Sequence, residues 1–176
     1  LALLAFVVFC AVSSSIYLVN DIMDRGQDRQ HPHKRRRPIA SGQVPVGLAA
    51  ATAVLLFAAS VALSLALGTR FLVVVLIYAA LSYAYCFGLK RVVIIDVMVL
   101  ASGYALRAVG GAVAIQVDFS SWLLLCTSLL ALFLGFCKRR QELTSLQEGA
   151  VAHRAVLANY TVSFLDQMIA VVTAAT

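Results

Sequence analysis

Charged residues are scarce in this sequence, and their scarcity excludes an ordinary water-soluble domain. Only 12% of the 176 residues are charged, whereas 62% are hydrophobic. Soluble domains average about a quarter charged and about half apolar residues. The few charges gather in short clusters between long apolar runs, as expected when each helix crosses a bilayer with about 20 apolar residues. The composition therefore predicts an all-α, polytopic transmembrane helical bundle.

Paired cysteine motifs are also absent, although four cysteines occur. No C-x-x-C exists, so neither a thiol metal site nor a disulfide framework is indicated. Single cysteines in apolar runs are typical of a hydrophobic interior. The sequence also lacks an initial Met, and it starts and stops within apolar runs. We therefore expect residues 1–176 to be one transmembrane domain, an internal fragment of a longer protein.

Six spans are predicted, and the basic residues orient them. The spans cover roughly residues 1–20, 46–67, 71–88, 92–115, 121–137 and 156–176, with polar loops expected at 21–45 and 138–155. Twelve of the 14 Lys and Arg residues fall in the first, third and fifth connections, whereas the opposite side holds only Arg70. The positive-inside rule places the charged loops in the cytoplasm of a bacterial-type plasma membrane. The net charge of +6 therefore needs no nucleic-acid partner.

A stripe of carboxylates marks the cytoplasmic end of the first span. Asp21, Asp24 and Asp28 follow Asn20 at spacings that place them within about 60° of one another on a helix. Three neighbouring carboxylates repel one another unless a hard cation neutralises them. Mg²⁺ typically binds one or two carboxylates and completes its shell with water and phosphate oxygens. The stripe predicts a magnesium site.

A dense set of basic and histidine side chains follows the stripe, comprising His31, His33, Lys34, Arg35, Arg36 and Arg37. Such side chains are phosphate-binding donors. An ordinary juxtamembrane loop contacting anionic lipid would also explain the arginines, but not the spaced carboxylates. The role of the two histidines stays open, and both are compatible with simple loop residues. Carboxylates for a metal beside cations for phosphate indicate diphosphate chemistry.

The segment from Asn20 to Gly42, with N-D-x-x-D-x-x-x-D followed by H-P-x-K-R-x-R-P-I-A-S-G, resembles the UbiA superfamily of intramembrane transferases. The resemblance implies that this motif ends the second of nine helices, so six of an expected nine spans are present. It also implies that Asp21, Asp24 and Asp28 bind Mg²⁺, and that Asn20, Lys34 and Arg37 contact a diphosphate substrate. The family places a Tyr and a Lys-Arg pair at the mouth of its cavity, here Tyr85, Lys90 and Arg91.

The fourth span carries two ionisable residues, Asp96 and Arg107. They lie eleven residues apart, so they project in nearly the same direction, and Gly103, Gly110 and Ala114 fall close to that face. A charged side chain facing lipid costs about 3 kcal/mol or more, so we expect Arg107 to point into the bundle. There it is either a substrate ligand or a structural partner of another helix.

The end of the fifth span departs from the family pattern. Most relatives carry D-x-x-x-D at the corresponding helix end, and here Lys138 and Glu142 hold those positions. Together with Arg139, this resembles the branch that transfers a phosphoribosyl group from 5-phosphoribosyl diphosphate to a polyprenyl phosphate, for cell wall biosynthesis. The resemblance implies catalytic roles for the Asp stripe, Lys138 and Glu142, and phosphate binding by Lys138 and Arg139.

Two alternatives remain open at this level. One is a UbiA-type prenyltransferase that uses a prenyl diphosphate and an aromatic acceptor. The other is a cation-coupled transporter, although its site would be expected near the midplane and not at one membrane face. The expected partners are the two substrates and membrane lipids, and a homo-oligomer is compatible with every alternative. Asp166, inside the last span, is an ionisable residue of unassigned role.

Overall fold

The computed structural model is all-α and describes residues 1–32, 34–146, 157 and 159–175. The long helices are α1 (Ala2–Gln30), α3 (Val46–Leu67), α4 (Thr69–Phe87), α5 (Ile95–Ile115), α6 (Ser121–Leu146) and α8 (Val162–Ala175). A short helix α2 (Pro38–Ser41) and two 3₁₀ turns, η1 (Lys34–Arg36) and η2 (Leu89–Arg91), occupy two of the connections.

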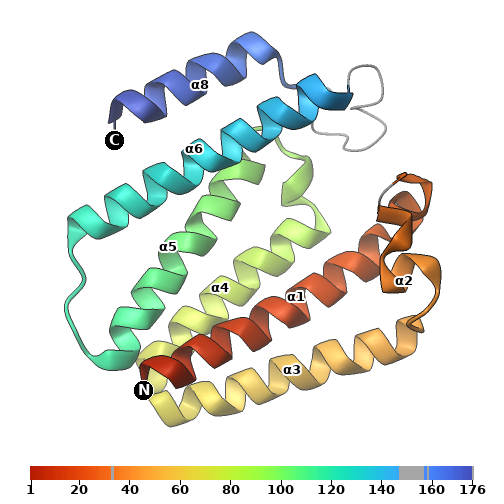
Figure 1. Cartoon of the computed structure of the whole chain (residues 1–176). Coiled ribbons are helices and arrows are strands. Elements are labelled where there is room, and N and C mark those ends of the chain that lie inside the picture. The colour runs from red at the N-terminus through yellow and green to blue at the C-terminus, as the bar shows by residue number, and fades with distance from the viewer. Residues whose placement is uncertain (33, 147–156, 158, 176) are drawn as a thin grey trace.

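The helices pack in a curved row in which chain neighbours are also neighbours in space. Helix α1 lies between α3 and α4, α5 packs between α4 and α6, and α8 returns along α6 (Figure 1). The end of α1, the η2 turn and the end of α6 share one side of the bundle, whereas the α3–α4 and α5–α6 connections lie at the other. This arrangement brings the expected site residues to one end.

The outer surface of the bundle is apolar. Five helices are long and apolar enough to cross a membrane, α1, α3, α4, α5 and residues 121–144 of α6. Large side chains such as Leu3, Phe6 and Trp122 point outward. So large an exposed apolar surface is unfavourable in water and favourable in lipid. The chain is therefore an integral membrane protein.

Two of the predicted loops contain helix. Helix α1 continues ten residues beyond the predicted end of its span, and α6 continues through Leu146. Hydropathy locates the part of a helix that lies in lipid, but the backbone hydrogen bonds continue past that boundary. As a result, the Asp stripe and Glu142 lie on rigid helices and not on loops.

The predicted sixth span is shorter than expected. Helix α8 has 14 residues, about 21 Å, less than the 30 Å of a bilayer core. It starts at Val162 because the hydroxyl of Thr161 accepts a hydrogen bond from the Phe164 amide, which caps the helix. Residues 156, 158 and 176 of the predicted span lie outside the described residues.

Glycines let α5 approach α1 and α4 closely. A Cβ built on Gly110 would lie 2.5 Å from the ring of Phe9, and one on Gly103 would lie 3.5 Å from Tyr78. Phe9 itself packs edge-on against Phe71 and Tyr78 in the core. The core between α1, α4 and α5 therefore has no room for a side chain at residue 110.

We expect Gly110→Ala to lower the free energy of unfolding of the detergent-solubilised protein by about 1–3 kcal/mol, the usual cost of overpacking. Gly111→Ala is the matched control, because a Cβ there meets nothing within 4 Å. Thermal unfolding of the two variants measures the difference. Equal stability of both would show that Phe9 can move aside at no cost.

Candidate functional site

Asp21 and Asp28 converge on one cation at the end of α1. The Nη1 atom of Arg37 donates to Asp21 Oδ1 at 2.8 Å and to Asp28 Oδ2 at 3.0 Å. Seven residues separate the two aspartates, which places both on the same side of α1. Arg37 reaches them from the residue before α2, and Arg29 Nε donates to the Ala40 carbonyl oxygen at 2.9 Å, which ties α2 to α1. The first half of the predicted site is thus assembled from local segments.

Asp24 has a different partner from the other two aspartates. Its carboxylate pairs with the ammonium of Lys90, which also donates to Asn20 Oδ1 at 3.3 Å. Lys90 lies in η2, 66 residues from Asp24, and both side chains are largely shielded from solvent. This pair joins the α4–α5 connection to the acidic stripe, so Asn20, Asp24 and Lys90 lie together.

A buried network joins α5, α6 and the segment before α8. We define it as Asp96, Arg139, Glu142 and Tyr160. Arg139 is 1% exposed, and it donates through Nε to Asp96 at 2.7 Å and through Nη1 to Glu142 at 2.7 Å. The Tyr160 hydroxyl donates to the other oxygen of Asp96 at 2.7 Å. Burial, together with the hydrogen bond to Asp96, raises the pKa of Tyr160 to about 12, so the hydroxyl keeps its proton.

This network changes the role expected of Arg139. We predicted a phosphate ligand, but the guanidinium is enclosed and already neutralised by two carboxylates. The sequence could not reveal this pairing, because Asp96 lies 43 residues away on another helix. Removing one partner of such a buried pair costs about 3–5 kcal/mol, which makes Arg139 a structural residue first.

The turn into α5 is strained. Ile94, the residue before the helix, has φ 68° and ψ −48°, a conformation that β-branched residues rarely adopt. Such backbone strain costs about 1–3 kcal/mol and persists only where the surroundings enforce it. The Ile94 amide donates to the Tyr160 hydroxyl at 2.7 Å. The buried network therefore reaches the backbone of the turn that carries Lys90.

Arg107 points into the bundle, as predicted. Its Nη1 donates to the Tyr78 hydroxyl at 3.0 Å, and its guanidinium lies 5.5 Å from the Tyr78 ring centroid and 4.5 Å from that of Tyr104. Tyr78 also forms a hydrogen bond with Ser13 of α1. Asp96 and Arg107 nevertheless contact different neighbours, since Asp96 reaches α6 and Arg107 reaches α4. Aromatic rings compensate the charge at this depth.

The remaining predicted residues are spread around the same end. Lys138 is exposed and has no ion pair within the described part of the chain. Tyr85 lies close enough to Arg139 to interact with its charge. The Lys34 amide donates to His31 Nδ1 at 3.3 Å, whereas His33 lies outside the described residues. Asp166 of α8 forms an ion pair with Arg140 of α6. Its partner therefore lies near the predicted site residues but is not one of them.

Sequence reasoning missed Arg25 as a site candidate. It lies one helical turn after Asp21, and its Nε is buried without a hydrogen-bond partner in the described part of the chain. A buried donor without a partner is unfavourable by about 1–3 kcal/mol. Its four-residue spacing from Asp21 was the available signal, because residues four apart lie on one helix face.

The acidic residues fit Mg²⁺ in chemistry, although not as a preformed cluster. No group of three His, Cys, Asp or Glu side chains close enough to hold a metal occurs among the described residues. Asp21 and Asp28, however, already converge on one cationic atom. Two carboxylates are what Mg²⁺ usually takes from a protein when phosphate supplies further ligands. A divalent cation is therefore expected at Asp21 and Asp28. Asp24 lies beside them and forms an ion pair with Lys90.

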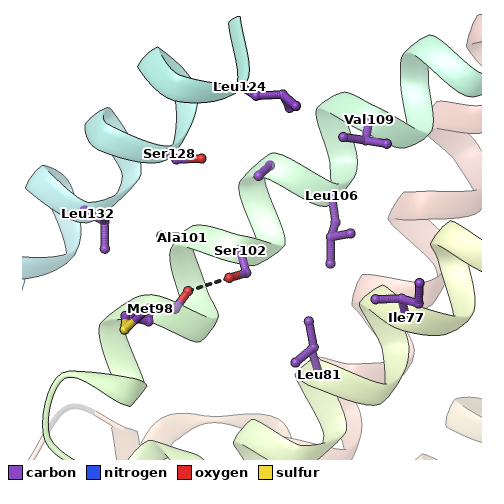
Figure 2. Close-up of a pocket in the computed structure, with 11 residues that line it drawn as sticks. Ile77, Leu81, Met98, Ala101, Ser102, Leu106, Val109, Leu124, Ser128 and Leu132 are labelled. Carbon is purple, nitrogen blue, oxygen red and sulfur yellow. Dashed lines mark hydrogen bonds between the residues drawn. The ribbon is translucent and has the colours of Figure 1, made fainter. Parts of the chain in front are cut away.

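An apolar groove of about 520 Å³ lies away from these polar residues. It is lined by α4, α5 and α6, with residues such as Leu81, Met98 and Leu132 facing it (Figure 2). Met98 precedes Arg107 by nine residues, about half a turn out of phase, so the groove occupies the opposite face of α5. None of its lining residues belongs to the polar site.

The fold and this polar end define an integral membrane protein of the UbiA architecture. A solved structure, titled a UbiA homolog from Archaeoglobus fulgidus bound to DMAPP and Mg²⁺, superimposes with a TM-score of 0.82 at 16% identity, over 99% of this chain and 62% of that one. Residues 1–164 match the sequence model of the UbiA prenyltransferase family. The chain belongs to that family.

Two of its curated relatives carry the same enzyme name. The decaprenyl-phosphate phosphoribosyltransferases of Mycolicibacterium smegmatis and Corynebacterium glutamicum are each 43% identical over 92% of this chain. The chain spans about half the length of both, 51% and 49% respectively.

Proposed function

We propose that the whole protein transfers the 5-phosphoribosyl group from phosphoribosyl diphosphate to a polyprenyl phosphate and releases diphosphate. The observation that carries this proposal is the 43% identity to decaprenyl-phosphate phosphoribosyltransferases across 92% of the chain. The geometry supports it, because Arg37 and Lys90 gather beside three carboxylates at one end of the bundle. The site would face the cytoplasm, on the side where the basic residues lie.

The reaction is a displacement at the anomeric carbon of ribose. The bond from this carbon to the diphosphate oxygen breaks, a bond to an oxygen of the lipid phosphate forms, and diphosphate leaves with the electron pair. Arg37, Lys90 and Lys34 neutralise the charge that develops on the leaving group. The lipid phosphate is already an anion, so the nucleophile needs no strong general base.

Asp21 and Asp28, with Asp24 beside them, would hold Mg²⁺ against the diphosphate. When bound, the metal makes the diphosphate a better leaving group by neutralising its charge. Arg37 lies at the point where these two carboxylates meet. We therefore expect Arg37 to turn from the carboxylates to the donor phosphates when the metal and donor bind.

The test is radiolabel transfer by the full-length protein in membranes. We expect label to pass from phosphoribosyl diphosphate to decaprenyl phosphate in a Mg²⁺-dependent reaction. We expect none to pass from a prenyl diphosphate to an aromatic acid. Efficient prenylation of the aromatic acceptor, without phosphoribosyl transfer, would instead establish the prenyltransferase alternative. Chelation by EDTA should stop transfer, and added Mg²⁺ should restore it.

Lys138 provides a second test of donor choice. The phosphoribosyl donor carries a 5-phosphate in addition to its diphosphate, so its site needs more cations than a prenyl diphosphate site. Lys138 is exposed at the end of α6, where it is available to a ligand. We expect Lys138→Asp to reduce phosphoribosyl transfer by about 10²-fold, the size of effect seen when one charge-stabilising group is lost. Lys138→Arg is the charge-preserving control, and full activity of Lys138→Asp would remove Lys138 from the site.

A further inference from the structure

We propose that Tyr160 is a positioning residue that keeps Lys90 on Asp24 by holding the strained backbone of Ile94. The proposal rests on the proposed function, since it assigns Tyr160 a task in the same site. Tyr160 lies 70 residues from Lys90 in the sequence and touches neither Lys90 nor Asp24 through a hydrogen bond. Its action is therefore indirect, through the turn that joins α4 to α5.

The first step of the argument is the set of contacts of the Tyr160 hydroxyl. It accepts from the Ile94 amide at 2.7 Å and donates to Asp96 at 2.7 Å. One buried hydroxyl therefore binds both the residue before α5 and a residue in the first turn of α5. Asp96 is itself held by a hydrogen bond from the buried Arg139. Tyr160 is 4% exposed and packs against Phe164, which leaves its ring little freedom. The hydroxyl is thus a rigid point of attachment.

The second step is the backbone that this attachment controls. Between Lys90 and α5 the backbone hydrogen bonds are local, such as those from Val92 to Leu89 and from Ile95 to Val93. The bond from Ile94 to Tyr160 connects this turn to a distant segment. Without it, Ile94 can relax to a negative φ, because a positive φ is unfavourable for a β-branched residue. That relaxation changes the orientation of η2 relative to α5, which follows it in the chain.

The third step links the turn to the site. Lys90 lies four residues before Ile94, and its ammonium pairs with Asp24 and Asn20 of α1. A lysine chain is flexible, so its position depends on where the backbone of η2 places it. If the turn moves, Lys90 leaves Asp24 and the acidic stripe loses its cation on that side. Tyr160 therefore connects the segment before α8 to the end of α1.

The proposal predicts a second-site rescue. We expect Tyr160→Phe in the full-length protein to reduce kcat for phosphoribosyl transfer by about tenfold, with a smaller change in the KM for the lipid acceptor. Glycine adopts a positive φ without the strain that a side chain causes. Hence Ile94→Gly should restore most of the kcat when combined with Tyr160→Phe, and by itself should change little. Tyr17→Phe, which removes an exposed hydroxyl from α1, is the control. A loss of thermal stability with normal activity per folded molecule would overturn the proposal.

Cys86 gives a readout that does not depend on catalysis. Its thiol is 3% exposed and lies near the charges of Lys90 and Asp24. We expect N-ethylmaleimide to alkylate Cys86, identified by mass spectrometry, several-fold faster in Tyr160→Phe than in wild type. The added Ile94→Gly change should restore protection. Unchanged protection in Tyr160→Phe would overturn the proposal. If wild type transferred no phosphoribosyl group, the proposed function would fail, and Cys86 labelling would still decide whether Tyr160 holds the turn.

Discussion

Asp24→Asn is expected to abolish Mg²⁺-dependent turnover while leaving the bundle folded. The substitution removes the carboxylate that pairs with Lys90, in the centre of the acidic stripe between Asp21 and Asp28. It keeps the size and hydrogen-bonding capacity of the side chain, so α1 should remain intact. Loss of one group that stabilises the transferring phosphate typically costs about 10²–10³-fold, and loss of a metal-site carboxylate at least as much. Initial rates of radiolabel transfer across a Mg²⁺ titration measure this effect.

Asp118→Asn is the matched control for this experiment. Asp118 lies in the α5–α6 connection, at the other end of the bundle from Lys90, and is exposed. It has the same chemistry and the same change in net charge, but no place in the site. We expect wild-type rates for it. Unchanged turnover in Asp24→Asn would remove Asp24 and its pair with Lys90 from the site, and equal losses in both variants would point to a general effect of charge.

Asp96→Leu is expected to lower the free energy of unfolding by about 3 kcal/mol, because it leaves the buried Arg139 without one of its two carboxylate partners. Glu142 remains on the guanidinium, which keeps the loss at the low end of the usual range for a broken buried pair. Thermal unfolding in detergent measures the effect. The double variant Asp96→Leu with Arg139→Met should recover most of the stability, since an apolar pair of similar size needs no charge compensation.

The control for Asp96→Leu is a surface pair on the neighbouring helices. Arg140 and Asp166 are both about half exposed, and exposed pairs contribute roughly 0–1 kcal/mol. Asp166→Asn should therefore change the midpoint of unfolding little. A loss as large as that of Asp96→Leu would mean that the Arg140–Asp166 pair is shielded by lipid in the membrane protein.

The sequence predicted how the charged side chains at the end of α1 are arranged. Asp21, Asp24 and Asp28 share a helix stripe because residues three, four and seven apart share a face, and Arg37 reaches them within one connection. The inward direction of Arg107 also followed from the sequence, since a lipid-facing charge is costly. Helix ends were less accurate, because hydropathy changes at the membrane boundary whereas helices continue beyond it.

The sequence by itself determined the class of protein, five of the six predicted membrane spans and the acidic stripe, because composition, periodicity and charge placement are local properties of the chain. Only the tertiary structure decided which charges pair. Arg139 pairs with Asp96, Lys90 pairs with Asp24, and the Tyr160 hydroxyl accepts from the Ile94 amide, across separations of 43 to 66 residues. In a medium that cannot solvate charge, each buried ionisable group must find a partner, and that partner is fixed by helix packing, which no short stretch of sequence encodes.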